Sequence, residues 1–175
     1  MARTRLVTVD DAEELAETLA RNRGFLAPWE PLRDDAYFTI PTQRALLENA
    51  LAEHEVGRTL PLAIVEEGRL VGRINLSGIR RGGLQSGAVG YWVAADSNGR
   101  GLATEAVAEV VELAFGPWNL HRVQAETLPE NIASQRVLER NGFTRYGTVP
   151  EYLRIAGRWR DHVLFHRINR DWRPL

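Results

Sequence analysis

The chain has 175 residues, of which 44% are apolar and 26% are charged, and this composition is typical of one globular domain covering residues 1–175. It contains no cysteine, which excludes disulfides and thiolate chemistry and favours a reducing compartment, the cytoplasm. The formal net charge of −1 argues against a dedicated DNA- or RNA-binding protein. All 22 basic residues are arginine, so a Walker-type phosphate loop, which needs lysine, is also excluded.

The N-terminal segment carries charges throughout and lacks the apolar core of a signal peptide. No stretch approaches the roughly 20 apolar residues of a membrane span, so we expect no membrane partner. The arginines are unevenly spread: residues 1–139 hold 14 against 20 acids, and residues 140–175 hold 8 against 3 acids. This basic, aromatic C-terminal segment leaves a non-catalytic RNA-binding module as a remote alternative.

The first half of the chain alternates between strand and helix patterns. These patterns predict a strand at 5–9, a helix at 10–22 with Asp10 as its N-cap, a second helix at 41–54, two strands that meet in a hairpin at Glu67-Gly68 within 60–79, and a strand at 87–94. The segment between the two helices is irregular, and two prolines bracket Trp29 and Glu30 there. Core packing is the simplest interpretation of Trp29.

The second half repeats the alternation. Its patterns predict a helix from about Leu102 to Ala114, a strand at 121–127, a short helix at 131–142 with Asn131 as its N-cap and Asn141-Gly142 as its stop, and two final strands at 143–149 and 157–168. The resulting order, β-α-α-β-β-β-α-β-α-β-β, indicates a mixed α/β sheet domain.

A glycine-rich segment, "DSNGRG", separates the strand at 87–94 from the helix that follows. Free backbone N–H groups at a helix N-terminus bind phosphate, and Gly99 and Gly101 would let such a ligand approach the backbone. Arg100 could add a charge and Thr104 a hydroxyl. An ordinary Asn-Gly turn is the alternative, since so short a pattern has little specificity. The dinucleotide-binding pattern is not met, because position 104 is Thr instead of a third glycine.

A second strand-to-helix opening lies in "LPENIASQRVLERNGF". Ser134 falls in the first turn of the predicted helix and Arg136 lies one turn from its start. Taken alone, such a segment is more often an ordinary surface helix. Two openings of this kind could nevertheless face one elongated ligand.

The segments "GYWVAADSNGRGLATEAV" and "HRVQAETLPENIASQRVLERNGF" resemble the GCN5-related N-acetyltransferases (GNAT), in particular the RimJ/RimL branch, which acetylates the N-termini of ribosomal proteins. The pyrophosphate-binding pattern of the family, Q/R-x-x-G-x-G/A, is met at Asn98, Gly101 and Ala103, with Asn in place of Gln or Arg. "NRGFLAPWEP" and "EYLRIAGRWRDHVLF" are also similar to this branch.

The resemblance implies a central, mixed, splayed seven-stranded sheet flanked by about four helices, with acetyl-CoA in the V-shaped opening. The implied acetyl-CoA contacts are Tyr91, Trp92, Val93, Asn98, Gly99, Arg100, Gly101, Leu102, Ala103, Thr104, Asn131, Ser134 and Arg136. Among these, the strand edge at 91–93 would pair with the pantetheine arm. A backbone N–H near Trp92 or Val93 would stabilise the oxyanion.

The resemblance also suggests roles for acidic and hydroxyl side chains. Ser134 is the expected general acid, because the tyrosine that other members carry four residues later is Leu138 here. Glu151 matches an acidic position of the branch and is the first candidate for the general base, with Glu30 and Glu126 as rivals. A salt bridge to a C-terminal arginine is the structural alternative for Glu151. Trp29, Glu30 and Glu126 are the expected acceptor-binding residues.

The predicted function is therefore transfer of an acetyl group from acetyl-CoA to a primary amine by direct attack in a ternary complex. The preferred acceptor is a protein or peptide N-terminus, and a small amine such as an antibiotic, a polyamine or an amino acid is the alternative. We expect no metal, because no His/Asp/Glu group has metal-ligand spacing. We expect no DNA partner, and the protein to be a monomer or a homodimer.

Overall fold

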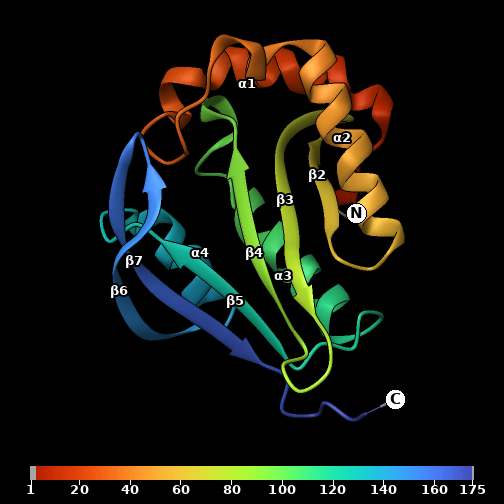
Figure 1. Ribbon diagram of the computed structural model, residues 1–175, viewed down its shortest axis with the longest axis vertical. Coiled ribbons are helices and arrows are strands. Elements are labelled where there is room, and N and C mark those ends of the chain that lie inside the picture. Colours follow the sequence, from red (N-terminus) through yellow and green to blue (C-terminus); the bar gives the residue numbers. More distant parts are fainter. Residues whose placement is uncertain (1–2, 175) are drawn as a thin grey trace.

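The computed structural model describes residues 3–174, which form a mixed sheet of seven strands in the order β1-β2-β3-β4-β5-β7-β6 together with four α-helices (Figure 1). The strands are β1 (Thr4–Leu6), β2 (Leu60–Glu66), β3 (Arg69–Arg80), β4 (Ser86–Val93), β5 (Arg122–Thr127), β6 (Thr144–Ile155) and β7 (Arg158–Ile168). The helices are α1 (Ala12–Leu26), α2 (Ile40–Glu55), α3 (Leu102–Phe115) and α4 (Ile132–Arg140), with short 3-10 turns η1 (Val9–Asp11), η2 (Asp35–Phe38) and η3 (Ala95–Ser97). The predicted α/β class is confirmed.

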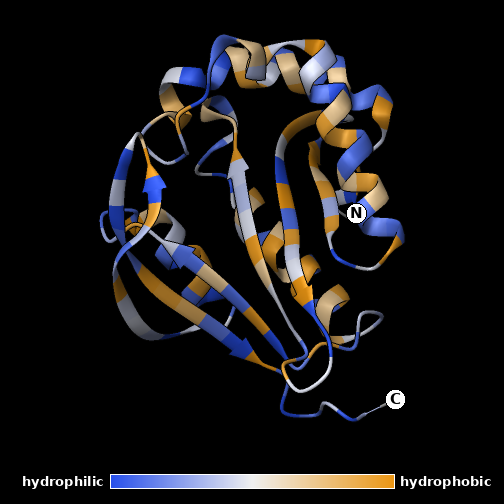
Figure 2. Ribbon diagram, viewed as in Figure 1, coloured by the Kyte–Doolittle hydropathy of each residue, from blue (hydrophilic) through white to orange (hydrophobic). Residues whose placement is uncertain are grey.

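The helices cover the two faces of the sheet unequally. In Figure 1, α3 and α4 lie behind the sheet, while α1 and α2 cover only its upper and right-hand parts from the other side. The larger apolar core lies between α3 and the sheet, and a smaller one lies under α1 and α2. Along β5 apolar and polar residues alternate, so this strand buries one face and leaves the other polar (Figure 2). No helix within residues 3–174 is both long and apolar enough to cross a membrane.

At two helix starts, those of α1 and α4, a side chain accepts a backbone hydrogen bond. The prediction of Asp10 as the first N-cap is wrong, because the carboxylate of Asp11 accepts the Thr8 N–H at 2.7 Å and pairs with Arg5 at 2.6 Å, which delays α1 to Ala12. The prediction for α4 is confirmed, since Oδ1 of Asn131 accepts the backbone N–H of Ser134 at 3.1 Å.

The centre of the sheet is splayed. β4 and β5 pair in parallel only where Ser86–Ala88 meets Arg122–Gln124. Beyond these residues, β5 continues its antiparallel pairing with β7 as far as Thr127 and Val163, while β4 stays with β3. A V-shaped opening therefore separates the upper halves of β4 and β5.

The edge of β4 that faces this opening follows from strand alternation. The Ala94 N–H donates to Val71 O at 2.7 Å, so the backbone groups of Trp92 also face β3. Those of Tyr91 and Val93 therefore face the opening. Of the two residues expected to stabilise the oxyanion, Val93 has its N–H on the correct side and Trp92 does not.

The hairpin of β6 and β7 extends further than the sequence patterns predict. β6 runs to Ile155, past a register shift between Val149 and Leu153. At the tip of the hairpin, the Ala156 N–H donates to Glu30 O at 2.9 Å. The loop between α1 and α2 is thereby tied to the last hairpin, and the two together border one end of the opening.

Candidate active site

The glycine-rich segment forms a concave surface at the start of α3. Gly99 and Gly101 have φ of +77° and +84°, in the left-handed region that favours glycine. A Cβ at either position would meet no atom within 4 Å, so the backbone here is open to a ligand. The N–H groups of the first turn of α3 have no intrahelical acceptor, because a helix leaves its first amides unpaired.

This surface belongs to a cavity of about 290 Å³, which we call the glycine cavity. Its lining residues are Val93, Ser97, Asn98, Gly99, Gly101, Leu102, Ala103, Thr104, Ala133, Arg136, Val137 and Arg140. The start of α3 and one face of α4, from Ala133 to Arg140, therefore line the same cavity. Arg136 and Arg140 supply positive charge from one face of α4.

Two residues of the predicted pyrophosphate site have other partners. The Nδ2 group of Asn98 donates to Val93 O and Ala94 O, both at 3.0 Å, and so fixes the turn out of β4. Asn98, at the first position of the family pattern, therefore stabilises the loop. Arg100 forms an ion pair with Glu66 at 2.7 Å and does not line the glycine cavity, contrary to the expectation of a charged contact.

Arg140 is a cavity residue that the sequence reasoning missed. It lies four residues after Arg136, and this i,i+4 spacing on a predicted helix was the available signal.

A second cavity, of about 280 Å³, continues from the glycine cavity into the opening of the sheet. This connecting cavity is lined by Phe25, Leu26, Trp29, Tyr91, Trp92, Val93, Asn98, Ala103, Asn131, Ala133, Ser134 and Val137. The predicted strand edge at 91–93 and the start of α4 therefore form opposite walls of one passage.

The two walls of this passage meet at Tyr91 and Ser134. The Tyr91 hydroxyl lies 2.9 Å from Ser134 Oγ and 3.2 Å from Ser134 O. Burial raises the pKa of Tyr91 to about 12, so its proton is retained at neutral pH. The Ser134 hydroxyl is thus held where the two walls of the passage meet, by a group that can donate or accept.

A third cavity, of about 210 Å³, lies at the other end of the passage. We call it the acidic cavity because two carboxylates, Glu30 and Glu126, line it. Glu30 comes from the loop after α1 and Glu126 from the end of β5. Burial raises the pKa of both carboxyl groups, although Arg33 partly offsets the effect for Glu30.

Trp29 and His162 also line the acidic cavity. Trp29 is 38% exposed, so it is a wall residue and not a core residue. His162 is buried on β7, and the sequence pattern had suggested only a strand residue there. Across residues 3–174, no group of three or more His, Asp or Glu side chains is arranged to hold a metal ion.

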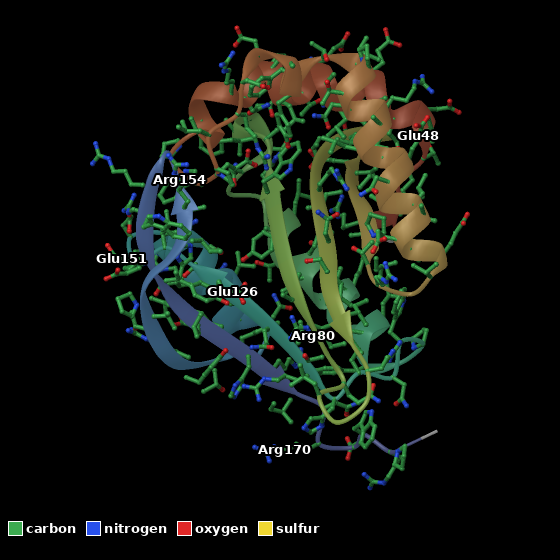
Figure 3. The ribbon with its side chains drawn as sticks, viewed as in Figure 1. Glu48, Arg80, Glu126, Glu151, Arg154 and Arg170 are labelled. Carbon is green, nitrogen blue, oxygen red and sulfur yellow. The ribbon has the colours of Figure 1, made fainter. Side chains whose placement is uncertain are left out.

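Glu151, the first candidate for the base, lies outside all three cavities. It has a positive φ of +48° in the irregular part of β6, its side chain is exposed, and its backbone N–H donates to Asp161 Oδ1 at 2.9 Å. Figure 3 shows Glu151 at the outer edge of the molecule, whereas Glu126 lies near its centre. The structure therefore brings Ser134 together with Glu126 and Glu30 but does not bring Glu151 to them.

The comparisons with known proteins agree with this geometry. The family model described as "Acetyltransferase (GNAT) domain" matches residues 3–144. The probable N-acetyltransferase YjcK of Bacillus subtilis is 36% identical over 169 residues, which cover 95% of this chain and 93% of that protein. The [ribosomal protein uS5]-alanine N-acetyltransferase of Escherichia coli is 34% identical over 172 residues, which cover 97% of this chain and 89% of that protein.

Among solved structures, Mycobacterium smegmatis RimJ in complex with CoA-disulfide has a TM-score of 0.93 at 32% identity, covering 98% of this chain and 83% of that chain. The resemblance to the RimJ/RimL branch is confirmed by these matches, and with it the splayed seven-stranded fold. The family model alone covers well over half of the chain, so the chain belongs to the GCN5-related N-acetyltransferase family.

Proposed function

We propose that this protein transfers an acetyl group from acetyl-CoA to the α-amine at the N-terminus of a protein or peptide. The observation that carries the proposal is the passage through the splayed sheet, which joins the glycine cavity to the acidic cavity past Ser134. The relative from Escherichia coli, whose name states that it acetylates an alanine of ribosomal protein uS5, supports the choice of acceptor.

The residues present fit acetyl-CoA. The amides at the start of α3, together with Arg136 and Arg140, provide donors and positive charge for a pyrophosphate. The connecting cavity, with Tyr91 and Val93 presenting backbone groups, suits the amide-containing pantetheine arm. When bound, acetyl-CoA would supply a thioester carbonyl as the electrophile. Arg100 would then act by holding the loop through Glu66, without touching the phosphates.

The acidic cavity suits the incoming amine. An N-terminal α-amine has a reference pKa of about 7.7–8.0, so it is largely protonated at neutral pH and must lose a proton before it attacks. Glu30 and Glu126 would attract the ammonium form. Glu126 lies at the end of β5, in the opening of the sheet, and we assign it the role of base, either by direct contact or through one water. This assignment replaces Glu151, which is exposed elsewhere.

At the thioester, negative charge develops on the carbonyl oxygen and then on the departing sulfur, and both need stabilisation. The Val93 N–H, on the open edge of β4, is the candidate donor to the oxyanion that forms at the thioester carbonyl. Ser134 would give its proton to the departing thiolate, with Tyr91 holding its hydroxyl in place. The chemistry proposed here uses no metal ion, and one chain supplies every residue, so it applies to a monomer or a homodimer.

An acceptor screen tests the proposal. Release of CoA would be measured with peptides beginning in Ala or Ser, the same peptides blocked at the N-terminus, an aminoglycoside, a diamine and free amino acids. We expect free Ala or Ser peptides to exceed every small amine at least tenfold in kcat/KM, a difference of about 1.4 kcal/mol. The blocked peptides should be inert. A small amine as the best substrate would replace the peptide proposal with the small-amine alternative.

The RNA-binding alternative is tested by measuring RNA affinity alongside the screen. RNA affinity without acetyl transfer, persisting in about 150 mM salt, would favour a binding module, because phosphate-driven binding weakens steeply with salt. With a ribosomal protein as acceptor, the proposed reaction would take place in the cytoplasm.

A further inference from the structure

Beyond the acidic cavity, one face of the sheet carries polar residues that no helix covers. Figure 1 shows that α1 and α2 leave the lower part of β3, β4 and β5 open on the side away from α3 and α4. Val123 and Ala125 of β5 are buried on the helix side. By strand alternation, Arg122, Gln124 and Glu126 therefore lie in a row on the open face. The row begins at Glu126 in the acidic cavity and runs to Arg122, away from that cavity.

An aromatic cluster fixes the far end of this row. The rings of Tyr146 and His166 stack with centroids 4.7 Å apart and an interplanar angle of 18°. Gln124 donates to the Tyr146 hydroxyl at 2.9 Å, and the guanidinium of Arg122 lies 5.2 Å from the centre of the Tyr146 ring. Nη2 of Arg122 is 2.6 Å from His166 Nδ1. Arg122 is thus held by neutral groups in a defined position.

Among residues 3–174, Arg122 forms no ion pair, and its Nε–H is buried without a partner. Burial and the neighbouring Arg122 both lower the pKa of His166, so the imidazole facing the guanidinium is neutral.

Arg80 adds a second cation on the same face. It pairs in register with Ser86, and Ser86 pairs with Arg122, so the three residues lie side by side across β3, β4 and β5. Two strand spacings place the α-carbons of Arg80 and Arg122 about 10 Å apart. In the part of the chain that the structure describes, Arg80 forms no ion pair or side-chain hydrogen bond. Figure 3 shows Arg80 below Glu126, toward the lower end of the sheet.

We propose that Arg122 and Arg80 form a subsite for an acidic side chain of the acceptor polypeptide, near its fourth residue. The inference rests on the proposed function, because it takes Glu126 as the position of the acetylated amine. From Glu126 to Arg122, four residues of strand span about 13 Å, and an extended peptide covers the same distance in about four residues. The reach of the arginine side chains extends the subsite to acceptor positions three to five.

The charge pattern favours a peptide over a nucleic acid as the occupant. The acidic cavity offers negative charge to a cationic α-amine, and the two arginines offer positive charge about 13 Å further along. A peptide with a free N-terminus and an acidic fourth residue matches both ends. A polyanion would match only the arginines and would be repelled by Glu30 and Glu126. The residues of β4 on this face, Ala88 and Gly90, are small and leave room for the chain.

The test compares two peptides that begin with Ala and differ only at position four, Glu or Gln. With the unaltered protein, kcat/KM should favour the Glu peptide about fivefold, as expected for a partly exposed charge pair. Arg122→Gln should reduce this preference to below about twofold, with the activity on the Gln peptide retained. Arg80→Gln removes a charge that forms no ion pair within residues 3–174, so it should reduce the preference without disturbing the aromatic cluster.

Arg145→Gln is the matched control. Arg145 pairs with Phe165 and therefore lies on the opposite face of the sheet. Replacing it by Gln removes the same positive charge as Arg122→Gln does. Its variant should keep the full preference. Moving the Glu to position eight should abolish the preference in the unaltered protein.

The outcomes separate this inference from the function it rests on. Equal acetylation of the two peptides by the unaltered protein overturns the subsite and leaves the proposed function intact. An equal loss of preference in the Arg145 variant also overturns it, because a general charge effect would then explain the result. Acetylation of small amines but of neither peptide overturns the proposed function, and the subsite with it.

Discussion

The hydroxyl oxygens of Tyr91 and Ser134 lie 2.9 Å apart and join β4 to α4 across the opening of the sheet. Ser134 is further fixed through its backbone N–H, which Asn131 accepts. Because the strand and the helix come from opposite sides of the opening, this contact ties the two sides together. A side chain held in this way can present its hydroxyl in one orientation, which is what a general acid requires.

Ser134→Ala should therefore lower kcat by about 10- to 1000-fold, with a water molecule substituting in part for the hydroxyl. The acetyl-CoA affinity should stay nearly constant, because the amide contacts of the glycine cavity are unaffected. Tyr91→Phe keeps Ser134 but removes its partner, and should lower kcat by a smaller factor, about 3- to 10-fold. Steady-state kinetics and acetyl-CoA titration check both variants. An unchanged kcat in Ser134→Ala would remove Ser134 from the proton-transfer role.

Gly101→Val should weaken acetyl-CoA binding at least tenfold, a loss of about 1.4 kcal/mol. The reason is that Gly101 has φ of +84° and faces the open glycine cavity, so a branched side chain would strain the turn and obstruct the amides.

Gly57→Val is the matched control for this variant. Gly57 has φ of +74° and also has open space around its Cβ position, but it follows α2 and lines none of the three cavities. Gly57→Val should lose about as much thermal stability as Gly101→Val, with unchanged acetyl-CoA affinity. Equal affinities in the two variants would contradict the assignment of the glycine cavity to phosphate.

The local patterns were sufficient to predict the glycine-rich turn and the cap at Asn131, because both depend on neighbouring residues in the chain. The side-chain partner of Arg100 was not predictable in this way, since Glu66 lies on another strand. The position of the Glu151 carboxylate was even less predictable from local sequence patterns. Its position in "PEYL" matches an acidic position of the family branch, but the irregular backbone between Val149 and Leu153 determines where its carboxylate points. A register shift of this kind leaves no reliable mark in the sequence.

Glu30→Gln should raise the acceptor KM several-fold while acetyl-CoA affinity stays nearly unchanged. Glu30 lines the acidic cavity but not the glycine cavity, so its charge acts on the amine and not on the phosphates. Its backbone carbonyl accepts the Ala156 N–H, and this contact survives the substitution, so the loop should keep its position. Peptide and acetyl-CoA titrations measure the two effects separately. A fall in acetyl-CoA affinity instead would mean that the loop serves the other ligand.

Glu126→Gln should slow the reaction but make the protein more stable at pH 7. Burial raises the pKa of Glu126 in the folded state above its unfolded value of about 4.3. A raised pKa contributes stability below the unfolded value, and this contribution is lost as the pH rises through the folded value. At pH 7 the ionised Glu126 is therefore a cost, which Gln removes. Thermal melts should show a higher Tm for the variant at pH 7, and the difference should vanish below about pH 4.

The kinetic effect of Glu126→Gln should depend on pH in the opposite sense to its effect on stability. The loss in kcat/KM should be largest near pH 6, where an α-amine is mostly protonated, and should shrink above about pH 8, where the amine is neutral without a base. Glu151→Gln is the matched control, since its exposed carboxylate lies outside the acidic cavity, and it should leave both the rate and Tm nearly unchanged. If Glu151→Gln alone shows the pH-dependent loss, the base is Glu151, and the carboxylate must move into the cavity when acceptor binds. If Glu126→Gln lowers the rate equally at every pH, Glu126 holds the acceptor in place without taking its proton.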